Sequence, residues 1–269
     1  MNSLPLVTLI VPLFNRPLTL ARILRALDAQ TLPPGETEAI FVDDSGSESY
    51  ARQQAVLDGA PPRCAWKRLE TGLPRGVNGV SVARNLAIRA ARGEVLVFMD
   101  DDCVPHPRML EEHARAYEGG ARRICVGNRS EDEGILKLSP PLPLDREKSR
   151  REMEKSQRGE LGGGDFITAN ASARRGDVLE AGLFDERFAR AGEYGYEDRD
   201  LGDRLLALGL PFCFLRDAAV WIAPRESEPW EGAKVEAGKR AHARYRTIRK
   251  GLLADAVRAV RRKFRTSGD

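Results

Sequence analysis

The sequence predicts an α/β protein in which a doubly wound, mainly parallel sheet is followed by a basic helical tail. Apolar, β-branched runs alternate with amphipathic helical segments over residues 1–105, which is typical of strand–helix–strand units. Two of these runs end in acidic residues, and ligands of open α/β sheets bind at the carboxyl ends of strands. The 269 residues are 42% hydrophobic and 31% charged, as in globular proteins. We predict a single domain over residues 1–230 and a tail over residues 231–269.

The first predicted unit is a buried strand followed by a helix. Leu6–Leu13 (LVTLIVPL) is a continuous apolar run, as expected for a strand covered on both faces. Leucine and isoleucine recur on one helical face of Leu18–Gln30, and Pro33 and Pro34 close the unit. Glu38–Asp44 (EAIFVDD) is then predicted to be a second buried strand, and it ends in two acids.

Two further strands are predicted before residue 105. Cys64–Leu69 is the third, and the Gly-rich loop Gly72–Gly79 leads from it into a helix over Ser81–Ala91. Glu94–Asp102 (EVLVFMDDD) is the fourth and runs directly into three acids. Strands and helices therefore alternate up to this acidic end.

The second half of the chain has a weaker pattern. Prolines, a charged run and a glycine triplet occupy residues 131–164, which we interpret as a flexible lid loop or a mobile surface loop. Beyond it we expect a helix over Glu197–Leu208 and a strand over Phe212–Leu215. Lys and Arg alternate with apolar residues over Lys234–Arg265, which predicts one or two basic helices.

Three consecutive carboxylates follow the fourth strand. They repel one another unless a cation lies among them. If the backbone stays extended, Asp100 and Asp102 point to the same side and both reach one ion. Carboxylates together with phosphate oxygens suit Mg²⁺ or Mn²⁺. Taken alone, such a motif is more often an acidic turn that caps the next helix.

Two other acidic pairs lie at ends of predicted elements. Asp43 and Asp44 end the second strand, where a carboxylate accepts hydrogen bonds from a ribose or a base, although a helix-capping turn is the commoner reason for such a pair. Glu197 and Asp198 begin a predicted helix. The helix dipole stabilises acids there, and it also favours the ionised form that a general base needs.

Read in order, these segments resemble the family 2 glycosyltransferases of GT-A fold, a Rossmann-like fold. The resemblance runs from Val7 to Ile222. The segments that carry it are VTLIVPLFNRP (7–17), Asp43-Asp44-Ser45, GVSVARNLAI (79–88), FMDDD (98–102), TANASARR (168–175), and LFDERF with YGYEDRDLGDRL. The last resembles the ED motif of galactosyltransferases and chondroitin polymerases.

The resemblance implies roles for individual residues. It implies a nucleotide-binding half over residues 1–105 and an acceptor-binding half over 165–230. The nucleotide-sugar contacts would be Pro12, Phe14, Asn15, Arg16, Asp43, Asp44, Arg84, Asn85, Asp100 and Asp101. Asp100 and Asp102 would hold Mn²⁺ or Mg²⁺, Glu197 and Asn170 would bind the acceptor, and Asp198 would be the catalytic base.

The implied reaction is inverting transfer from a nucleotide sugar, most commonly a UDP-sugar in this family, to a hydroxyl of a carbohydrate, lipid-linked or other acceptor. One departure concerns the metal. Many relatives place a metal-binding His after the last strand, but Ala219–Ile222 holds none, and the chain has only His106, His113 and His242. Water or another side chain would take that place.

Two other functions compete with transfer. Asp100 to Val104 fits the DxDx[TV] pattern of haloacid-dehalogenase-type phosphatases, in which Asp100 would be the nucleophile. That motif normally lies on the first strand of its domain, whereas here it follows at least two strand–helix units. A catalytically inactive relative that binds nucleotide is the other alternative, and the intact Asp100, Asp102 and Asp198 argue against it.

Charge and hydropathy limit the partners. A net charge of +3 is too small to indicate nucleic acid. The four cysteines lack CxxC spacing, so they indicate neither a zinc site nor a disulfide framework. No signal peptide and no apolar run of membrane-spanning length is apparent. We therefore expect a cytoplasmic protein whose basic tail either contacts the inner face of the membrane or packs on the domain.

Overall fold

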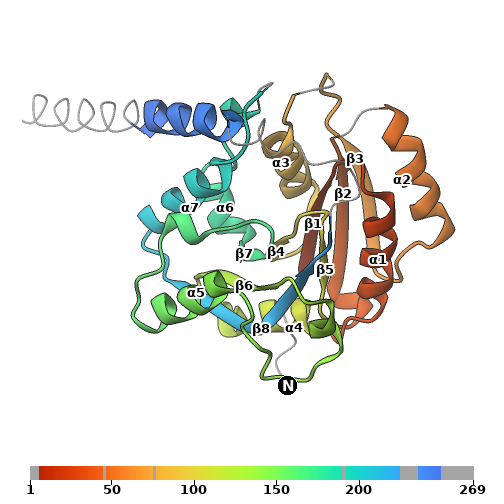
Figure 1. The fold of residues 1–269 in the computed structure, drawn as a ribbon, viewed down its shortest axis with the longest axis horizontal. Coiled ribbons are helices and arrows are strands. Elements are labelled where there is room, and N and C mark those ends of the chain that lie inside the picture. The colour runs from red at the N-terminus through yellow and green to blue at the C-terminus, as the bar shows by residue number, and fades with distance from the viewer. Residues whose placement is uncertain (1–5, 45–46, 75–76, 190–191, 225–235, 250–269) are drawn as a thin grey trace, which may run out of the picture.

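A computed structural model describes residues 6–44, 47–74, 77–189, 192–224 and 236–249. Within these residues the strands form one eight-stranded sheet in the order β3-β2-β1-β4-β7-β6-β8-β5 (Figure 1). The strands are β1 (Val7–Leu13), β2 (Thr37–Asp43), β3 (Ala65–Glu70), β4 (Val95–Phe98), β5 (Cys103–Pro105), β6 (Ile124–Ser130), β7 (Ala171–Arg174) and β8 (Phe212–Ile222).

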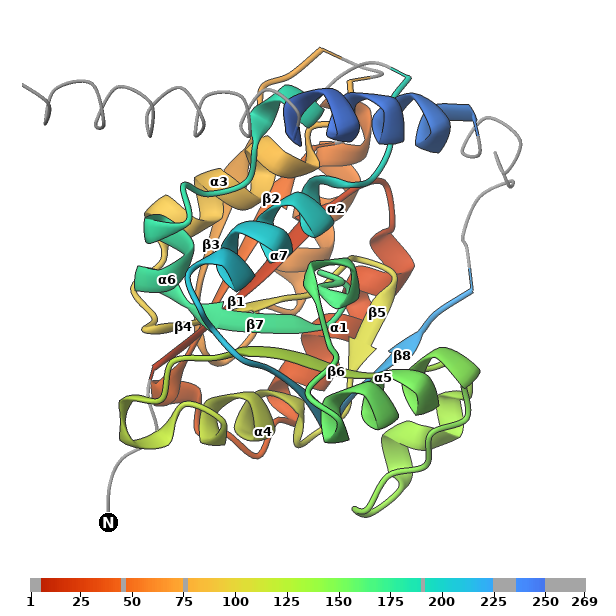
Figure 2. The same ribbon diagram turned by 90° about the vertical axis from the view of Figure 1, so that its left-hand side faces the viewer.

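Helices cover both faces of this sheet (Figure 2). The α-helices are α1 (Pro17–Asp28), α2 (Ser47–Gly59), α3 (Val80–Ala90), α4 (Met109–Arg115), α5 (Glu147–Gln157), α6 (Arg175–Glu180) and α7 (Glu197–Ala207), and residues 236–249 form a further helix. The 3₁₀ turns are η1 (Pro34–Glu36), η2 (Glu118–Gly120), η3 (Glu133–Lys137), η4 (Gly163–Asp165) and η5 (Glu186–Phe188).

Side chains of the central strand β1 alternate between two core clusters, which shows the face of the sheet that each helix covers. Leu9 and Val11 of β1 pack in the core cluster that also holds the apolar residues of α1, α2 and α4. Ile10 lies in the opposite cluster with the apolar residues of α3, α6 and α7. Successive side chains of a strand point to opposite faces, so β1 is buried on both sides. This arrangement is the doubly wound α/β fold that the sequence predicts.

The first four strands are parallel, and the sheet becomes mixed beyond them. β1 pairs in parallel with both β2 and β4, and β2 with β3. β7 is antiparallel to β4 and β6, whereas β6 and β8 are parallel. The carboxyl ends of β1, β2 and β4 therefore meet at one edge, where ligands of such sheets bind.

Two strands end several residues away from the predicted position. β4 ends at Phe98 rather than continuing to Asp102, because the amide of Cys103 donates to the carbonyl of Asp100 at 3.1 Å and closes a turn. The acids therefore lie in a turn and not on extended backbone. β8 continues past the predicted end, Leu215, to Ile222 and pairs with β5.

The segment over residues 131–164 also differs, because it contains η3, α5 and η4. Helix α5 has no apolar stripe, since its buried residues are Ser149 and Glu152. Its anchor is a buried ion pair in which Arg129 Nη2 donates to both carboxylate oxygens of Glu152, at 2.5 and 2.7 Å. Sequence periodicity detects apolar stripes and not single buried charges, so the predicted loop without regular structure was wrong.

The basic tail is helical over residues 236–249. Ala237, Ala241 and Ile248 are buried at 3%, 1% and 7% exposure, so this helix packs on the domain. The remainder of the predicted tail, residues 231–235 and 250–269, and Ser45 lie outside the described residues. Among the residues that are described, no helix combines the length and apolarity needed to span a bilayer.

Candidate active site

Arg84 of α3 joins two of the predicted acidic groups. Its side chain is only 3% exposed. Nη2 donates to Asp100 Oδ1 at 2.9 Å and Nη1 donates to Glu197 Oε1 at 2.8 Å. Burial alone would lower the pKa of Arg84, but the two carboxylates raise it above its ordinary value. Arg84 is thus a fixed cation between the acids after β4 and the acids that begin α7.

The three acids after β4 face different surroundings. The side chains of Asp100 and Asp102 are 37% and 34% exposed, whereas that of Asp101 is 13% exposed. Asp101 Oδ2 accepts from the amide of Phe14 at 2.6 Å, and Oδ1 lies 3.4 Å from Arg16 Nε. Burial raises the pKa of Asp101 to about 8. Both oxygens of Asp101 therefore contact the β1–α1 loop, and its contact with the nucleotide stays a prediction.

The β1–α1 loop held by Asp101 lies at the same edge. Phe14 is 61% exposed, and Asn15 has a left-handed backbone with φ of 55°. Arg16 Nη2 lies 3.9 Å from Asp102 Oδ2, and no hydrogen-bond partner for its Nη1 is found among the described residues. Pro12 lies in β1 beside Val42 of β2. The exposed ring of Phe14 and the guanidinium of Arg16 thus lie where the nucleotide was predicted to bind.

Asp43 ends β2 and Asp44 follows it, and both are hydrogen-bonded within the protein. Asp43 is 3% exposed and accepts from Gln53 Nε2 at 3.1 Å and Arg68 Nη2 at 2.8 Å. Asp44, which is half-buried, accepts from Thr71 Oγ1 and from the amide of Gly79, each at 2.8 Å. Asp44 therefore ties the Gly-rich loop to the end of β2.

Gly79 is required by this close approach. A Cβ placed on it would lie 2.1 Å from Asp44 Oδ1, well inside van der Waals contact. Burial raises the pKa of Asp44, while its two donors lower it. A larger residue at this position would therefore displace the side chain of Asp44.

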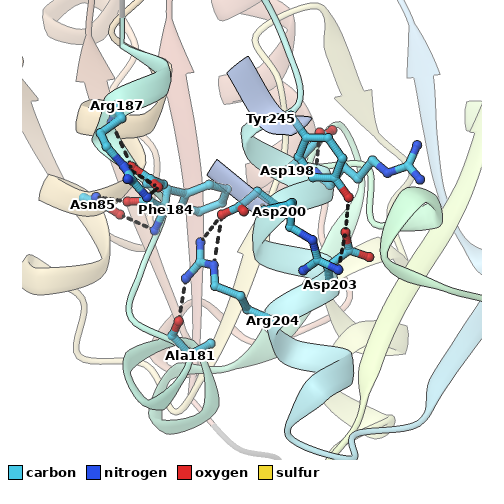
Figure 3. Close-up of polar contacts among 12 residues, drawn as sticks. Asn85, Ala181, Phe184, Arg187, Asp198, Asp200, Asp203, Arg204 and Tyr245 are labelled. Atoms are coloured by element: carbon cyan, nitrogen blue, oxygen red, sulfur yellow. Dashed lines mark hydrogen bonds and ion pairs between the residues drawn. The ribbon is translucent and has the colours of Figure 1, made fainter. Parts of the chain in front are cut away.

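Glu197 and Asp198 form the first turn of α7. Glu197 is 6% exposed, and its Oε2 has no hydrogen-bond partner among the described residues. Asp198 is partly exposed, and its Oδ1 accepts from the amide of Arg199 at 2.6 Å (Figure 3). Desolvation first, and then the charge of Glu197, raise the pKa of Asp198 to about 7. A carboxylate with such a pKa is suited to accept and release a proton near neutral pH.

Two predicted site residues, both asparagines, have structural roles within the protein. Asn170 is 1% exposed and donates to the carbonyls of Asn128 and Ala218 at 2.9 and 2.8 Å. Its Oδ1 lies 2.9 Å from His113 Nε2. An asparagine that is buried and hydrogen-bonded in this way supports the core, and its contact with an acceptor stays a prediction.

Asn85 is the second of these residues. It is 1% exposed, and its Nδ2 donates to the carbonyl of Phe184 while its Oδ1 accepts from the amide of Phe184, each at 2.9 Å (Figure 3). Its side chain therefore joins α3 to the loop before η5, and its contact with a nucleotide stays a prediction. Nothing in the sequence separates such a buried asparagine from an exposed one.

Sequence reasoning did not assign a role to Tyr194, which precedes the ED pair. Its side chain is 39% exposed. Burial of its hydroxyl, followed by the charges of Asp100 and Glu197, raises its pKa. Tyr194 therefore lies within electrostatic reach of both acids. Its position in the YGYED segment was the available signal.

The metal-binding capacity of the site rests on two acids. Among the residues that the structure describes, no group of three or more His, Cys, Asp or Glu side chains is arranged to hold an ion. Asp100 and Asp102 remain as the exposed pair. The amide after β8, that of Ala223, donates to the carbonyl of Asp102 at 2.7 Å, so the backbone that follows β8 passes beside this pair.

The sequence profile described as Glycosyl transferase family 2 matches residues 8–182, a span that includes the β2 acids, Arg84 and the acids after β4. The chain belongs to glycosyl transferase family 2. The matched span ends before α7, so the ED assignment rests on the quoted sequence resemblance and on the geometry around Arg84.

Curated relatives include other glycosyltransferases. The uncharacterized glycosyltransferase YfnE of Bacillus subtilis is 28% identical over 255 residues, which cover 78% of this chain and 62% of that protein. Glycosyltransferase AglE of Haloferax volcanii is 30% identical over 130 residues, covering 47% and 40%. Validoxylamine A glucosyltransferase of Streptomyces hygroscopicus subsp. limoneus is 27% identical, covering 84% and 53%. The chain thus spans less than two thirds of each relative's length.

Solved structures share the fold at low identity. A mannosyltransferase from Pyrobaculum calidifontis in complex with GDP-Man and Mn²⁺ has a TM-score of 0.62 at 18% identity, covering 84% of this chain and 59% of that one. TarS of S. aureus in complex with UDP has a TM-score of 0.62 at 17% identity, covering 81% and 60%. These matches confirm the GT-A fold.

Proposed function

We propose that the chain transfers a hexosyl group from a nucleotide-sugar donor, with UDP as the nucleotide, to an acceptor hydroxyl, and that it inverts the anomeric carbon. The observation that carries the proposal is the buried Arg84, whose guanidinium is shared between Asp100 and Glu197. The acids expected to serve the donor and those expected to serve the acceptor therefore lie on either side of one cation.

On the donor side, Asp100 and Asp102 would hold Mn²⁺ or Mg²⁺. Both carboxylates are partly exposed, and a pair of carboxylates completed by phosphate oxygens and water is a common ligand set for Mg²⁺. The ion, when bound, neutralises charge on the departing nucleoside diphosphate. The Pyrobaculum mannosyltransferase in complex with GDP-Man and Mn²⁺ supports this assignment.

The nucleotide itself would lie along the ends of β1 and β2. The exposed Phe14 offers an apolar face to a base, and Arg16 offers a cation to the diphosphate. Asp43 and Asp44 are already hydrogen-bonded in the protein, so they would shape this surface and accept further hydrogen bonds only through free lone pairs. The TarS complex with UDP-GlcNAc supports UDP as the nucleotide.

On the acceptor side, Asp198 would act as the general base. It takes the proton of the acceptor hydroxyl while that oxygen forms its bond to the anomeric carbon. The bond from the same carbon to the diphosphate oxygen breaks on the opposite face, and the leaving group carries away the electron pair. The pKa of about 7 supports this role. Glu197, fixed by Arg84, would bind the acceptor.

The ED segment and the lid remain finer predictions. The resemblance of YGYEDRDL to galactosyltransferase and chondroitin-polymerase sequences favours a carbohydrate acceptor, free or lipid-linked. The segment over residues 131–164, with α5 at its centre, would close over the donor as active-site loops do. A cytoplasmic location with peripheral membrane contact is likewise a prediction.

The phosphatase alternative is disfavoured by two observations. Asp100 Oδ1, the candidate nucleophile, is engaged by Arg84 at 2.9 Å, and its motif follows the strand β4 rather than β1. The family match over residues 8–182 also assigns this segment to transferases. An inactive nucleotide-binding relative would leave the raised pKa of Asp198 without a role.

Calorimetric titration tests the donor side. UDP, GDP and dTDP are titrated with and without Mn²⁺ into the wild-type protein, into Asp102→Ala, and into Glu118→Ala as an exposed control. We expect Mn²⁺-dependent binding of UDP that is lost in Asp102→Ala and retained in the control. The proposal would be contradicted in favour of the phosphatase if the protein binds no nucleotide, hydrolyses a small phosphate ester and loses this activity in Asp100→Asn.

A further inference from the structure

Tyr196, the residue directly before the ED pair, has an unusual backbone conformation. Its φ of 73° and ψ of −9° lie in the left-handed region. A bulky L-residue rarely adopts this conformation, and it persists only where surrounding contacts hold it. Because Tyr196 is the N-cap of α7, its backbone sets the direction in which Glu197 and Asp198 enter the site.

The contacts that hold Tyr196 come from the helix over residues 236–249. Its ring stacks on His242 with centroids 4.9 Å apart and an interplanar angle of 13°. It also lies against Tyr245, with centroids 5.6 Å apart and an angle of 33°. Two aromatic rings on successive turns of one helix thus fix the orientation of the Tyr196 ring.

The same helix also holds the loop that leads to Tyr196. Arg240 donates twice to the carbonyl of Gly192, at 2.8 and 2.6 Å. Arg244 forms a bidentate ion pair with Glu193, in which Nη2 lies 2.6 Å from Oε1. On the opposite side, Asn78 Nδ2 donates to the carbonyl of Glu193 at 3.4 Å. The loop is therefore held between the helix and the start of α3.

A third set of contacts reaches α7 itself. The hydroxyl of Tyr245 donates to Asp203 Oδ2, as the dashed line in Figure 3 shows, and Arg249 Nη2 lies 3.8 Å from the same oxygen. Figures 1 and 2 show the blue helix lying against this end of the domain. Both the first turn of α7 and a later one are thus tied to one helix.

We propose that the helix over residues 236–249 is a positioning element of the acceptor site, which holds Tyr196 in its left-handed conformation and so fixes Glu197 and Asp198. This inference rests on the proposed transferase function. Tyr196, His242 and Arg244 are positioning residues, because none of them contacts the acids after β4 in the structure. Basic residues of this helix thus make contacts within the protein, since Arg240 and Arg244 bind the acceptor-side loop.

The test uses the full chain with substitutions on both partners. Tyr196→Ala removes the ring contacts and leaves an L-residue for which the left-handed backbone is unfavourable, whereas Tyr196→Gly removes the ring but adopts positive φ readily. His242→Ala removes the stacking partner alone. Arg246→Ala changes an exposed residue of the same helix and is the matched control.

Two readouts are measured for each variant. The first is kcat and KM for transfer to an acceptor, compared with the dissociation constant for UDP in the presence of Mn²⁺. We expect Tyr196→Ala to lower kcat about tenfold or more with UDP affinity changed less than about twofold, since only acceptor-side geometry is lost. We expect Tyr196→Gly to recover part of kcat, His242→Ala to lower it several-fold, and Arg246→Ala to leave it unchanged.

The second readout is hydrogen exchange of the amides in residues 192–203, which needs no activity. Exchange should accelerate in Tyr196→Ala and His242→Ala and stay at the wild-type rate in Arg246→Ala. The inference would be overturned if exchange in Tyr196→Ala and His242→Ala stays at the wild-type rate and, where transfer is measurable, kcat also equals the wild-type value. A wild-type protein that binds no nucleotide would contradict the proposed function alone, and faster exchange in the variants would still support the positioning role of the helix.

Discussion

The guanidinium of Arg84 lies 2.8 Å from Glu197 Oε1, although the two residues are 113 positions apart in the chain. The pair brings α3 and the first turn of α7 together at the carboxyl edge of the sheet. The second amino group of Arg84 binds Asp100, so one buried cation balances two acids. Breaking this arrangement therefore has consequences for both stability and binding.

Arg84→Met should lower the free energy of unfolding by about 3 kcal/mol, because it leaves Glu197 buried without its cation. The estimate is at the low end for buried pairs, since Asp100 is 37% exposed and keeps part of its hydration. Urea denaturation measures the change. Arg89→Met, on the same helix but 54% exposed, is the control and should cost less than about 1 kcal/mol. Equal effects of the two substitutions would contradict the role of Arg84.

Much of this edge could be predicted from sequence, because acids at the ends of buried strands have to meet in a doubly wound sheet. The partners of these acids could not be predicted in the same way. The sequence does not show that Arg84 binds two carboxylates. Nor does it show that Asp101 contacts the β1–α1 loop and that Asn170 is hydrogen-bonded in the core. The residue types are visible in sequence, whereas the direction of each side chain depends on tertiary packing.

Irregular parts of the fold were the hardest to predict. The buried ion pair of Arg129 and Glu152 helps to hold helix α5, and no periodic pattern predicts such a contact. The strand β8 continues past its predicted end, Leu215, through the charged Arg216 and Asp217. In the structure, Asp217 accepts from the amide of Leu142 at 2.7 Å. Polar residues that have specific partners interrupt the apolar pattern, so regular structure that contains them is not predicted from the sequence.

Asp198→Asn should remove the acidic limb of the pH–rate profile. The wild-type rate of transfer should rise with pH through about 7, because the base acts only when deprotonated and its pKa is about 7. The variant should be slower by about two to four orders of magnitude, as expected for the loss of a general base. Initial rates between pH 5 and 9 measure this. Asp203→Asn, on the same helix, should keep the acidic limb, and a wild-type limb in Asp198→Asn would exclude Asp198 as the base.

The same raised pKa should make Asp198 a source of instability at high pH. The pKa of the Asp198 carboxyl is about 7 in the folded protein, whereas its ordinary value is 3.8. Between these two pH values the folded state therefore binds more protons at this group than the unfolded state does. The contribution of Asp198 to the free energy of unfolding is therefore fully present below pH 3.8 and is lost as the pH rises through about 7. Asp198→Asn should raise Tm relative to the wild type at pH 8 and change it little at pH 4. A gain confined to pH 4 would reverse the sign of the predicted linkage.

Gly79→Ala should destabilise the nucleotide-binding edge. The new Cβ would lie 2.1 Å from Asp44 Oδ1, so the Asp44 side chain has to move and its hydrogen bond from the Gly79 amide is weakened. Overpacking of this kind costs about 1–3 kcal/mol, and UDP affinity should fall with it. The control is Gly35→Ala, because a Cβ on Gly35 meets nothing within 4 Å. If the denaturation and titration curves of Gly79→Ala match those of Gly35→Ala, the added Cβ is accommodated with no loss of stability or UDP affinity.

Glu152→Gln should release helix α5 while the rest of the sheet stays folded. The substitution leaves the guanidinium of Arg129, which is 5% exposed, buried without a counter-charge, and breaking such a pair costs about 3–5 kcal/mol. Hydrogen exchange over residues 147–157 should accelerate, because this pair is the main polar anchor of α5, while exchange in β1 and β2 stays slow. Glu154→Gln changes an exposed acid of the same helix and should leave exchange unaltered. If Glu152→Gln instead accelerates exchange equally in β1, then α5 is part of the cooperative core and is held too firmly to move as a lid.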